Sequence, residues 1–277
     1  MIIMLSVFVL FACSFDTNKL ERIPVSGEVL TTGDDLEPYT EIIIAGPFDI
    51  ILDQNGGSDI EIETYESLMQ WVRTEMLEDG TMLLYLEDTS KSRSFNITFD
   101  DDEGFDELSR NAILSGSRLK WPGNEKLLNV VLSVDDLDKI QILGESKITT
   151  AQAFKTEKLK FEIAGAVHLD ADFDLYAMSI ELAGAGNLDM RGRAEYLSIE
   201  CAGAGTIKAY ELLTKNLNLE IAGVCNAQIY VEENLDVDLA GMGTVKYKGN
   251  PEHLSIDKAG IGSVKQVEKN EKNETEI

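Results

Sequence analysis

Apolar and polar residues alternate with a period of two through much of the second half of the chain. Within residues 197–201, Leu197, Ile199 and Cys201 fall on one side of the pattern and the two polar residues on the other. This alternation is typical of a β-strand with one buried face and not of a helix. An Ala-Gly pair then ends the strand, and a second short alternating segment follows at residues 205–209.

This strand–turn–strand unit occurs six times between residues 159 and 264. Successive alanines of the Ala-Gly pairs are 19, 19, 20, 18 and 19 residues apart: Ala164, Ala183, Ala202, Ala222, Ala240 and Ala259. A fixed period of this size indicates a solenoid in which each repeat forms one rung. About seven looser polar residues separate the rungs, too few for a helix. We therefore predict an all-β, right-handed parallel β-helix, with the glycine of each pair in a positive-φ turn.

Stacking would turn equivalent positions of the repeat into columns. Two apolar columns are predicted to fill the interior: Leu159, Met178, Leu197, Leu217, Leu235 and Leu254, and Phe161, Ile180, Ile199, Leu219, Val237 and Ile256. Lys258 replaces the apolar residue of a third column in the last repeat, which is typical of a capping rung.

The two ends of the chain differ in composition from the repeat. Residues 1–13 form an apolar run that is too short for a permanent membrane span and fits an export signal. The run ends in Leu-Phe-Ala-Cys13, which resembles a lipobox, so we predict lipidation of Cys13, the alternative being a plain signal peptide. Residues 14–38 are predicted to form a tether, residues 39–267 a single β-helix domain, and residues 268–277 a disordered tail.

Strand patterns also precede the repeat. Residues 41–64 contain three short strands, residues 71–86 read as a hairpin, and residues 127–134 as a further strand. Residues 140–148 resemble a degenerate rung in which Gly144 falls one residue before the Ala-Gly register.

Charge and cysteine content narrow the classes of partner. The net charge of −26 argues against nucleic acid and anionic lipid as direct partners and favours weak divalent cation binding.

The three cysteines do not form a disulfide framework. Cys201 belongs to an interior column, and Cys225 occupies a position that is glycine in four of the six repeats. Because they lie one rung apart on opposite sides of a turn, we predict two buried thiols without a bridge.

Several segments resemble a known family. Gly46-Pro-Phe-Asp-Ile50 and residues 137–148 are similar to the N-terminal strands of the auto-transporter adhesin head domains. Residues 247–251 and 259–264 are similar to that family's last two rungs. The similarity covers roughly residues 39–265 and implies a β-helix-like fold, an envelope location in Bacteroidetes-type lipoproteins and no established activity. The family usually has Ser-Gly at its turns where this chain has Ala-Gly, so no hydroxyl is expected in that column.

A column of carboxylates precedes the Ala-Gly pairs and is the candidate surface site: Glu162, Glu181, Glu200, Glu220, Asp238 and Asp257. Neighbours about 5 Å apart would repel each other by roughly 0.8 kcal/mol in water. One interpretation is a strip that binds divalent cations or a cationic partner. The other is a solvated face whose repulsion is relieved by Lys208, Lys246 and Lys265 on adjacent columns.

Two further polar features have both a structural and a functional interpretation. A second column, composed of His168, Asn187, Thr206, Asn226, Thr244 and Ser263, is predicted to hydrogen-bond along the stack, with saccharide contact as the alternative. The run from Asp100 to Glu107 has carboxylates at alternate positions, as calcium loops do, but lacks the EF-hand spacing. We interpret it as an acidic loop, with calcium binding as the alternative.

No arrangement of residues predicts catalysis, a cofactor or a metal centre. Arg191 and Arg193 lie in a predicted loop away from the line of acids, and no Ser-His-Asp set, Cys-His pair or phosphate loop is evident. The favoured hypothesis is a non-catalytic cell-envelope lipoprotein, held in the outer membrane by its lipid and facing the periplasm or the surface, whose β-helix binds a protein or glycan. The alternatives are a carbohydrate-active enzyme of the lyase or hydrolase type and a structural spacer.

Three features of a structure would separate these hypotheses. An aromatic patch beside a groove would favour glycan binding. A cluster of Asp with Lys or Arg outside the repeat pattern, in a cleft, would favour the enzyme. A uniformly charged surface without a groove would favour the spacer.

Overall fold

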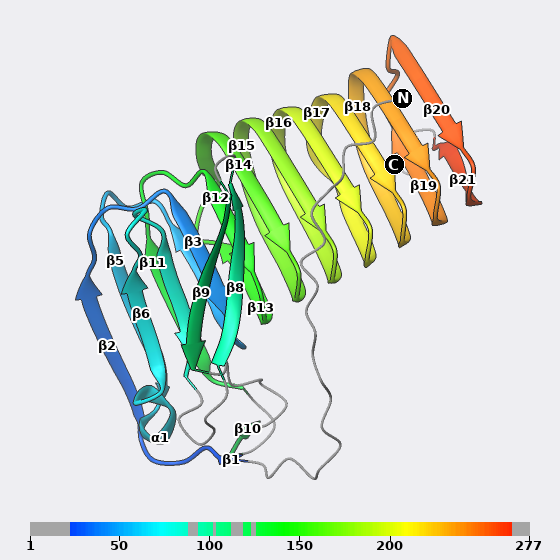
Figure 1. The fold of residues 1–277 in the computed structure, drawn as a ribbon. Coiled ribbons are helices and arrows are strands. Elements are labelled where there is room, and N and C mark those ends of the chain that lie inside the picture. Colours follow the sequence, from blue (N-terminus) through cyan, green and yellow to red (C-terminus); the bar gives the residue numbers. More distant parts are fainter. Residues whose placement is uncertain (1–22, 88–93, 102–103, 112–118, 123–125, 268–277) are drawn as a thin grey trace, which may run out of the picture.

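The computed structural model describes residues 23–87, 94–101, 104–111, 119–122 and 126–267, the strands within 94–111 by their backbone alone. These residues are almost all in β-strands, which wind into stacked parallel coils and form a β-solenoid of about seven turns (Figure 1). The prediction of a parallel β-helix is confirmed. Among the described residues, no helix is long and apolar enough to cross a membrane.

The repeat region is a series of long bent strands. They are β14 (Phe154–Ile163), β15 (Ala166–Leu182), β16 (Ala185–Cys201), β17 (Ala204–Ile221), β18 (Val224–Leu239), β19 (Met242–Lys248), β20 (His253–Lys258) and β21 (Ile261–Gln266). Each rung has a first side, which is the strand segment before the Ala-Gly turn, and a second side, which is the segment after it. Each of β15 to β18 forms the second side of one rung, bends, and continues as the first side of the next (Figure 1). The looser residues predicted between rungs are therefore strand as well. In residues 170–175, aspartates alternate with buried Ala171, Phe173 and Leu175, so the period of two continues there.

The predicted columns exist. Leu159, Met178 and Leu197 pair in register, as do Glu162, Glu181 and Glu200, and both series continue through β17, β18 and β20. The interior columns are buried between the two sides of each rung, where Phe161 on the first side meets Phe173 on the second with ring centroids 6.2 Å apart. Among the described residues nothing stacks on the outer side of the last rung, and Leu254 is 48% exposed while the equivalent Leu235 is 1% exposed.

The glycines of the Ala-Gly turns serve close stacking. The prediction of a positive φ was wrong, because none of these glycines is among the positive-φ residues. Instead, a Cβ added to Gly184 would lie 1.9 Å from the carbonyl oxygen of Gly165, and one added to Gly203 would lie 2.0 Å from that of Gly184. Backbone hydrogen bonds close each step, such as Ala185 N–H to the Gly165 carbonyl at 2.9 Å. The turns approach too closely for any side chain.

The N-terminal part adds rungs out of sequence order. Its elements are β1 (Ile23–Pro24), β2 (Val29–Asp35), β3 (Glu41–Ala45), β4 (Asp49–Asp53), β5 (Asp59–Tyr65), α1 (Glu66–Met69), β6 (Val72–Met76), β7 (Met82–Leu86), β8 (Ser94–Asp101), β9 (Gly104–Asn111), β10 (Leu119–Lys120), β11 (Leu128–Ser133), β12 (Lys139–Ile142) and β13 (Glu145–Thr150). The strands β3 and β4 stack in parallel between β12 and β13 on one side and β7 and β11 on the other. Antiparallel β6, β5 and β2 close this end of the solenoid.

Three sequence-based expectations differ from this part of the structure. Residues 29–35, inside the predicted tether, form β2 and pair with β5 because they are apolar and β-branched at their start. The acidic run is not a single loop, since Asp100 and Asp101 end β8 and Gly104 begins β9 in an antiparallel hairpin. Gly144 does keep the glycine register, because its carbonyl lies 2.0 Å from a Cβ added to Gly165. The signal segment with Cys13 and the tail at 268–277 lie outside the described residues.

Candidate functional site

A groove runs along the first sides of the rungs. It encloses about 1150 Å³ and crosses successive rungs from β14 to β20. Its middle part is lined by Tyr196, Ser198, Asn216, Asn218, Asn234 and Asp236. We call this feature the axial groove. It forms because two polar columns stand on either side of the buried leucine column, and three of its lining residues near one end, Ala177, Ser179 and Ser198, have small side chains.

Two tyrosines form an exposed aromatic pair at the axial groove. Tyr196 lines it and Tyr176 directly precedes Ala177, another lining residue. The rings are tilted with centroids 5.3 Å apart, and Tyr176 is 51% exposed and Tyr196 45% exposed. The charge of an ionised Tyr176 and its hydroxyl raise the pKa of Tyr196 above its usual value. Sequence reasoning missed this pair, although their separation of 20 residues is one repeat.

The amides and hydroxyls of the axial groove are only partly engaged within the chain. Asn234 donates to the Asn216 side-chain oxygen, and Asn216 donates to the Glu195 carbonyl at 3.3 Å. Within the described part of the chain, the side chains of Ser198 and Asn218 have no hydrogen-bond partner in the protein. The groove therefore offers free polar groups beside an aromatic surface, which is the usual composition of a small-molecule or saccharide site.

The predicted acidic column runs alongside this groove and is neutralised at one end only. Glu162 contacts Lys160 at 2.7 Å and Lys139 at 3.1 Å, and Lys160 also reaches Glu181 at 3.0 Å. Burial alone would raise the pKa of Glu162, but the bonds from Lys160 and Gln141 and the charge of Lys139 lower it. Burial, Glu220 and Glu181 raise the pKa of Glu200.

The remaining acids of this column have no ion pair in the described part of the chain: Glu200, Glu220, Asp238 and Asp257. The expected relief by Lys208, Lys246 and Lys265 does not occur there. These lysines stand in register on the second side of the rungs, and Lys208 approaches Asp189 instead, at 3.8 Å. Over the described residues, no three acidic, His or Cys side chains converge on a point where a metal ion could bind.

The second predicted polar column is also in register, from His168 through Asn187 and Thr206 to Ser263. Asn226 in this column accepts a hydrogen bond from the Thr244 backbone N–H at 3.1 Å, as expected for a stabilising ladder. His168 and Asn187 line a smaller cavity of about 310 Å³ together with Lys126 and Lys147. Lys126 pairs with Asp49 at 2.9 Å there.

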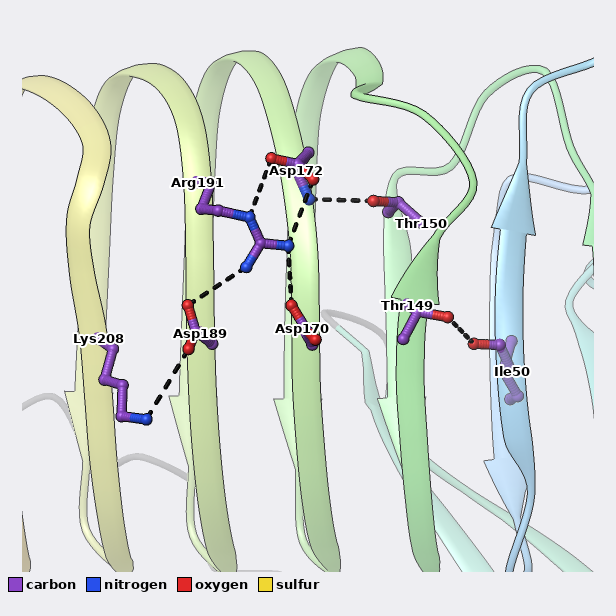
Figure 2. A network of polar contacts seen from close by, with 8 residues as sticks. All are labelled: Ile50, Thr149, Thr150, Asp170, Asp172, Asp189, Arg191 and Lys208. Atoms are coloured by element: carbon purple, nitrogen blue, oxygen red, sulfur yellow. Dashed lines mark hydrogen bonds and ion pairs between the residues drawn. The ribbon is translucent and has the colours of Figure 1, made fainter.

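An arginine network joins two neighbouring rungs, those of β15 and β16, on their second side (Figure 2). Arg191 contacts Asp170 at 2.8 Å, Asp172 at 3.2 Å and Asp189 at 3.3 Å. The Arg191 bond holds the pKa of Asp170 below its usual range. Arg191 was predicted to lie in a loop between rungs, away from the line of acids, but it lies within β16. The missed signal is the spacing of 19 residues between Asp172 and Arg191. Residues of this network are not among those that line either cavity.

The two interior cysteines are both buried, as predicted. Both are free thiols, and across adjacent rungs Cys225 lowers the pKa of Cys201 while Cys201 raises that of Cys225. Cys13 and the central residues of the acidic run at 100–107 fall outside the described residues, so lipidation and calcium binding there stay predictions.

Comparison with known proteins identifies the family. The family described as "Putative auto-transporter adhesin, head GIN domain" matches residues 38–251, and the chain belongs to it. No curated protein resembles the chain closely enough to count as a relative.

Several solved structures share the fold. A "putative adhesin" from Bacteroides fragilis NCTC 9343 has a TM-score of 0.72 at 20% identity, covering 88% of this chain and 100% of its own. A "Putative lipid binding protein" from Parabacteroides distasonis ATCC 8503 has a TM-score of 0.60 at 19% identity, covering 89% and 100%. A "putative adhesin" from Parabacteroides merdae ATCC 43184 has a TM-score of 0.53 at 18% identity, covering 89% and 99%. The family match makes the chain adhesin-like, and these structures share its β-solenoid fold.

Proposed function

We propose that this protein is an envelope lipoprotein whose solenoid binds an extended glycan along the axial groove. The observation that carries the proposal is the exposed Tyr176–Tyr196 pair at the groove, with ring centroids 5.3 Å apart. An aromatic ring offers a flat apolar face with a polar hydroxyl at its edge, which suits a sugar ring with its own apolar and hydroxylated faces. A protein partner is the alternative occupant.

The shape and polarity of the groove support a linear ligand. The lining residues recur once per rung, and rungs stack at about 4.8 Å, so equivalent polar groups repeat along the groove axis. A chain of similar saccharide units can meet such a series of equivalent groups unit by unit. The side chains of Ser198 and Asn218 are free to bond its hydroxyls.

Glycan binding is favoured over glycan cleavage by the place of the charged groups. Cleavage needs paired carboxylates facing the ligand, often with a cation nearby to stabilise developing charge. Within the described residues, the aspartates that gather around Arg191 lie on the second side of the rungs and line neither cavity. Among the residues that line the axial groove, Asp138 lies with Lys158 and Lys160 at one end. Asp236 and Glu252 lie several rungs away at the other end, so these two carboxylates have no lysine or arginine beside them in the lining.

A glycan array probed with the full chain, followed by calorimetric titration of the glycans that bind, tests the proposal. We expect Tyr196→Ala and Asn218→Ala to weaken binding, while Tyr230→Ala leaves it unchanged. Tyr230 is a matched control because it is a partly exposed tyrosine of β18 that does not line the groove. Binding that survives Tyr196→Ala, or the absence of any bound glycan, would contradict the proposal, and saturable cleavage of a glycan would overturn the non-enzymatic assignment.

The membrane anchor is a separate part of the proposal. The lipobox-like sequence before Cys13 supports thioether lipidation, and two or three acyl chains are enough for stable anchoring. Intact mass spectrometry of membrane-extracted protein should find diacylglycerol on Cys13, and Cys13→Ser should release the protein from the membrane fraction. Unmodified Cys13 in membrane-bound protein would show that a plain signal peptide or another anchor is used.

A further inference from the structure

The two cysteines of the solenoid occupy positions that face each other across a rung boundary. Cys201 is the last residue of β16, and Cys225 is the second residue of β18, one rung further on. Both are free in this structure and fully buried at 0% exposure, and each thiol shifts the pKa of the other. The third cysteine lies far from them in the sequence, at position 13.

Neighbouring rungs show what normally fills these two positions. Leu182 is in register with Cys201, and Gly205 is in register with Cys225. A Cβ added to Gly205 would lie only 2.8 Å from Leu182 Cδ2, so the large leucine requires a glycine opposite. The same relation recurs at the end of the solenoid, where a Cβ added to Gly262 would lie 3.0 Å from Leu239 Cδ2.

A Cys–Cys pair therefore replaces a Leu–Gly pair at one rung boundary. The smaller Cys201 leaves room that the Sγ of Cys225 fills, which keeps the corner packed while bringing two thiols together. Either cysteine alone would be an ordinary buried thiol. Their joint presence at facing positions is what indicates chemistry between them.

We propose that Cys201 and Cys225 form a disulfide that joins two successive rungs when the protein folds in an oxidising compartment. The oxidant is the disulfide of a thiol–disulfide oxidoreductase or of oxidised glutathione. Two S–H bonds break and one S–S bond forms, the two protons pass to solvent, and the two electrons reduce the oxidant's disulfide to two thiols. Because both thiols are buried in the folded protein, the exchange takes place while the rungs are still assembling. The link closes a loop of 24 residues and resists separation of the rungs.

Peptide mapping tests the link directly. The full chain is refolded in a glutathione redox buffer, free thiols are alkylated in denaturant, and the protein is digested with trypsin without reduction. Cys201 falls in peptide 194–208, Cys225 in peptide 216–246 and Cys13 in peptide 1–19, so each cysteine is separately identifiable. We expect peptides 194–208 and 216–246 to be found joined. Recovery of both peptides fully alkylated, or joined to peptide 1–19 instead, would overturn the proposal.

A thermal measurement tests whether the link holds the rungs together. Oxidised protein should have a Tm about 5–10 °C above that of protein kept in reductant. The matched control combines Cys201→Leu with Cys225→Gly, which restores the pair found at Leu182 and Gly205 and should fold with no redox-dependent shift. An equal Tm for oxidised and reduced protein of the natural sequence would show that no disulfide joins the two rungs.

Discussion

The two outward sides of the solenoid are built on the same repeat but satisfy their polar groups in opposite ways. On the second side, Arg191 forms ion pairs with three aspartates of two neighbouring rungs (Figure 2). On the first side, the axial groove keeps free amides and hydroxyls beside two exposed tyrosines, and the acidic column is neutralised only at Glu162 and Glu181. The comparison indicates that the second side stabilises the stack, while the first side is available to a ligand.

Both sides depend on the glycine column, which gives the largest expected effect. Gly203→Ala would place a Cβ about 2.0 Å from the Gly184 carbonyl oxygen and force the stacked turns apart. We expect a loss of about 3 kcal/mol or more in the free energy of unfolding, measured by urea denaturation. Gly56→Ala is the control for a simple glycine replacement, since nothing lies within 4 Å of its added Cβ, although its φ of +92° carries a cost of about 1 kcal/mol. Equal losses for the two variants would contradict the close-stacking explanation.

Removal of an aromatic ring tests whether the ligand binds on the first side of the solenoid and not on the second. Tyr196→Ala should weaken glycan binding about tenfold, by removing roughly 1–1.5 kcal/mol of ring contact, and should leave the unfolding free energy nearly unchanged because the ring is exposed. Calorimetric titration measures the first quantity and urea denaturation the second. Arg191→Ala should leave affinity unchanged. If it instead weakened binding as much as Tyr196→Ala does, the two sides would not be functionally distinct.

Replacement of Arg191 tests whether the second side stabilises the stack of rungs. Arg191→Ala removes one guanidinium from three carboxylates and leaves them facing one another, so we expect a loss of about 1 kcal/mol of stability that decreases in high salt. Arg193→Ala is the matched control, because within the described residues Arg193 pairs with Asp174 alone and its side chain is 69% exposed. Its replacement should leave urea denaturation unchanged. A salt-independent loss at Arg191 would indicate lost packing rather than lost charge.

The smallest expected effect comes from two members of the acidic column, Glu162 at its paired end and Glu200 in its interior. The pKa of Glu162 is lowered in the folded state, so its stabilisation is present above its unfolded pKa and is lost as pH falls through the folded value. The pKa of Glu200 is raised, so its charge costs stability at neutral pH and the cost disappears on protonation. Glu162→Gln should therefore destabilise at pH 7, and Glu200→Gln should stabilise, each by about 0.5 kcal/mol. If urea denaturation showed that both variants change the free energy of unfolding in the same direction, the two carboxylates would lie in equivalent environments.

The sequence alone determined the architecture and the columns of the repeat. Its Ala-Gly period located every rung from Ala164 to Ala259, and the alternation within each rung separated buried from outward positions. Both are local patterns with a fixed period, so counting residues is enough to place them. The reason for the turn glycine was not predictable in this way, because it depends on how closely the turn of the next rung approaches.

Only the tertiary structure decided which side chains of different rungs meet. Tyr176 with Tyr196, Arg191 with its aspartates, and Cys201 with Cys225 are each about one repeat apart or slightly more, but their meeting depends on the bend between the two sides of a rung and on small register shifts between strands. The axial groove likewise depends on the stacked arrangement of polar columns around the leucine column. Sequence periodicity fixes the order of residues along each rung, whereas contact distances between rungs follow from the path of the backbone and the volumes of the side chains packed at its corners.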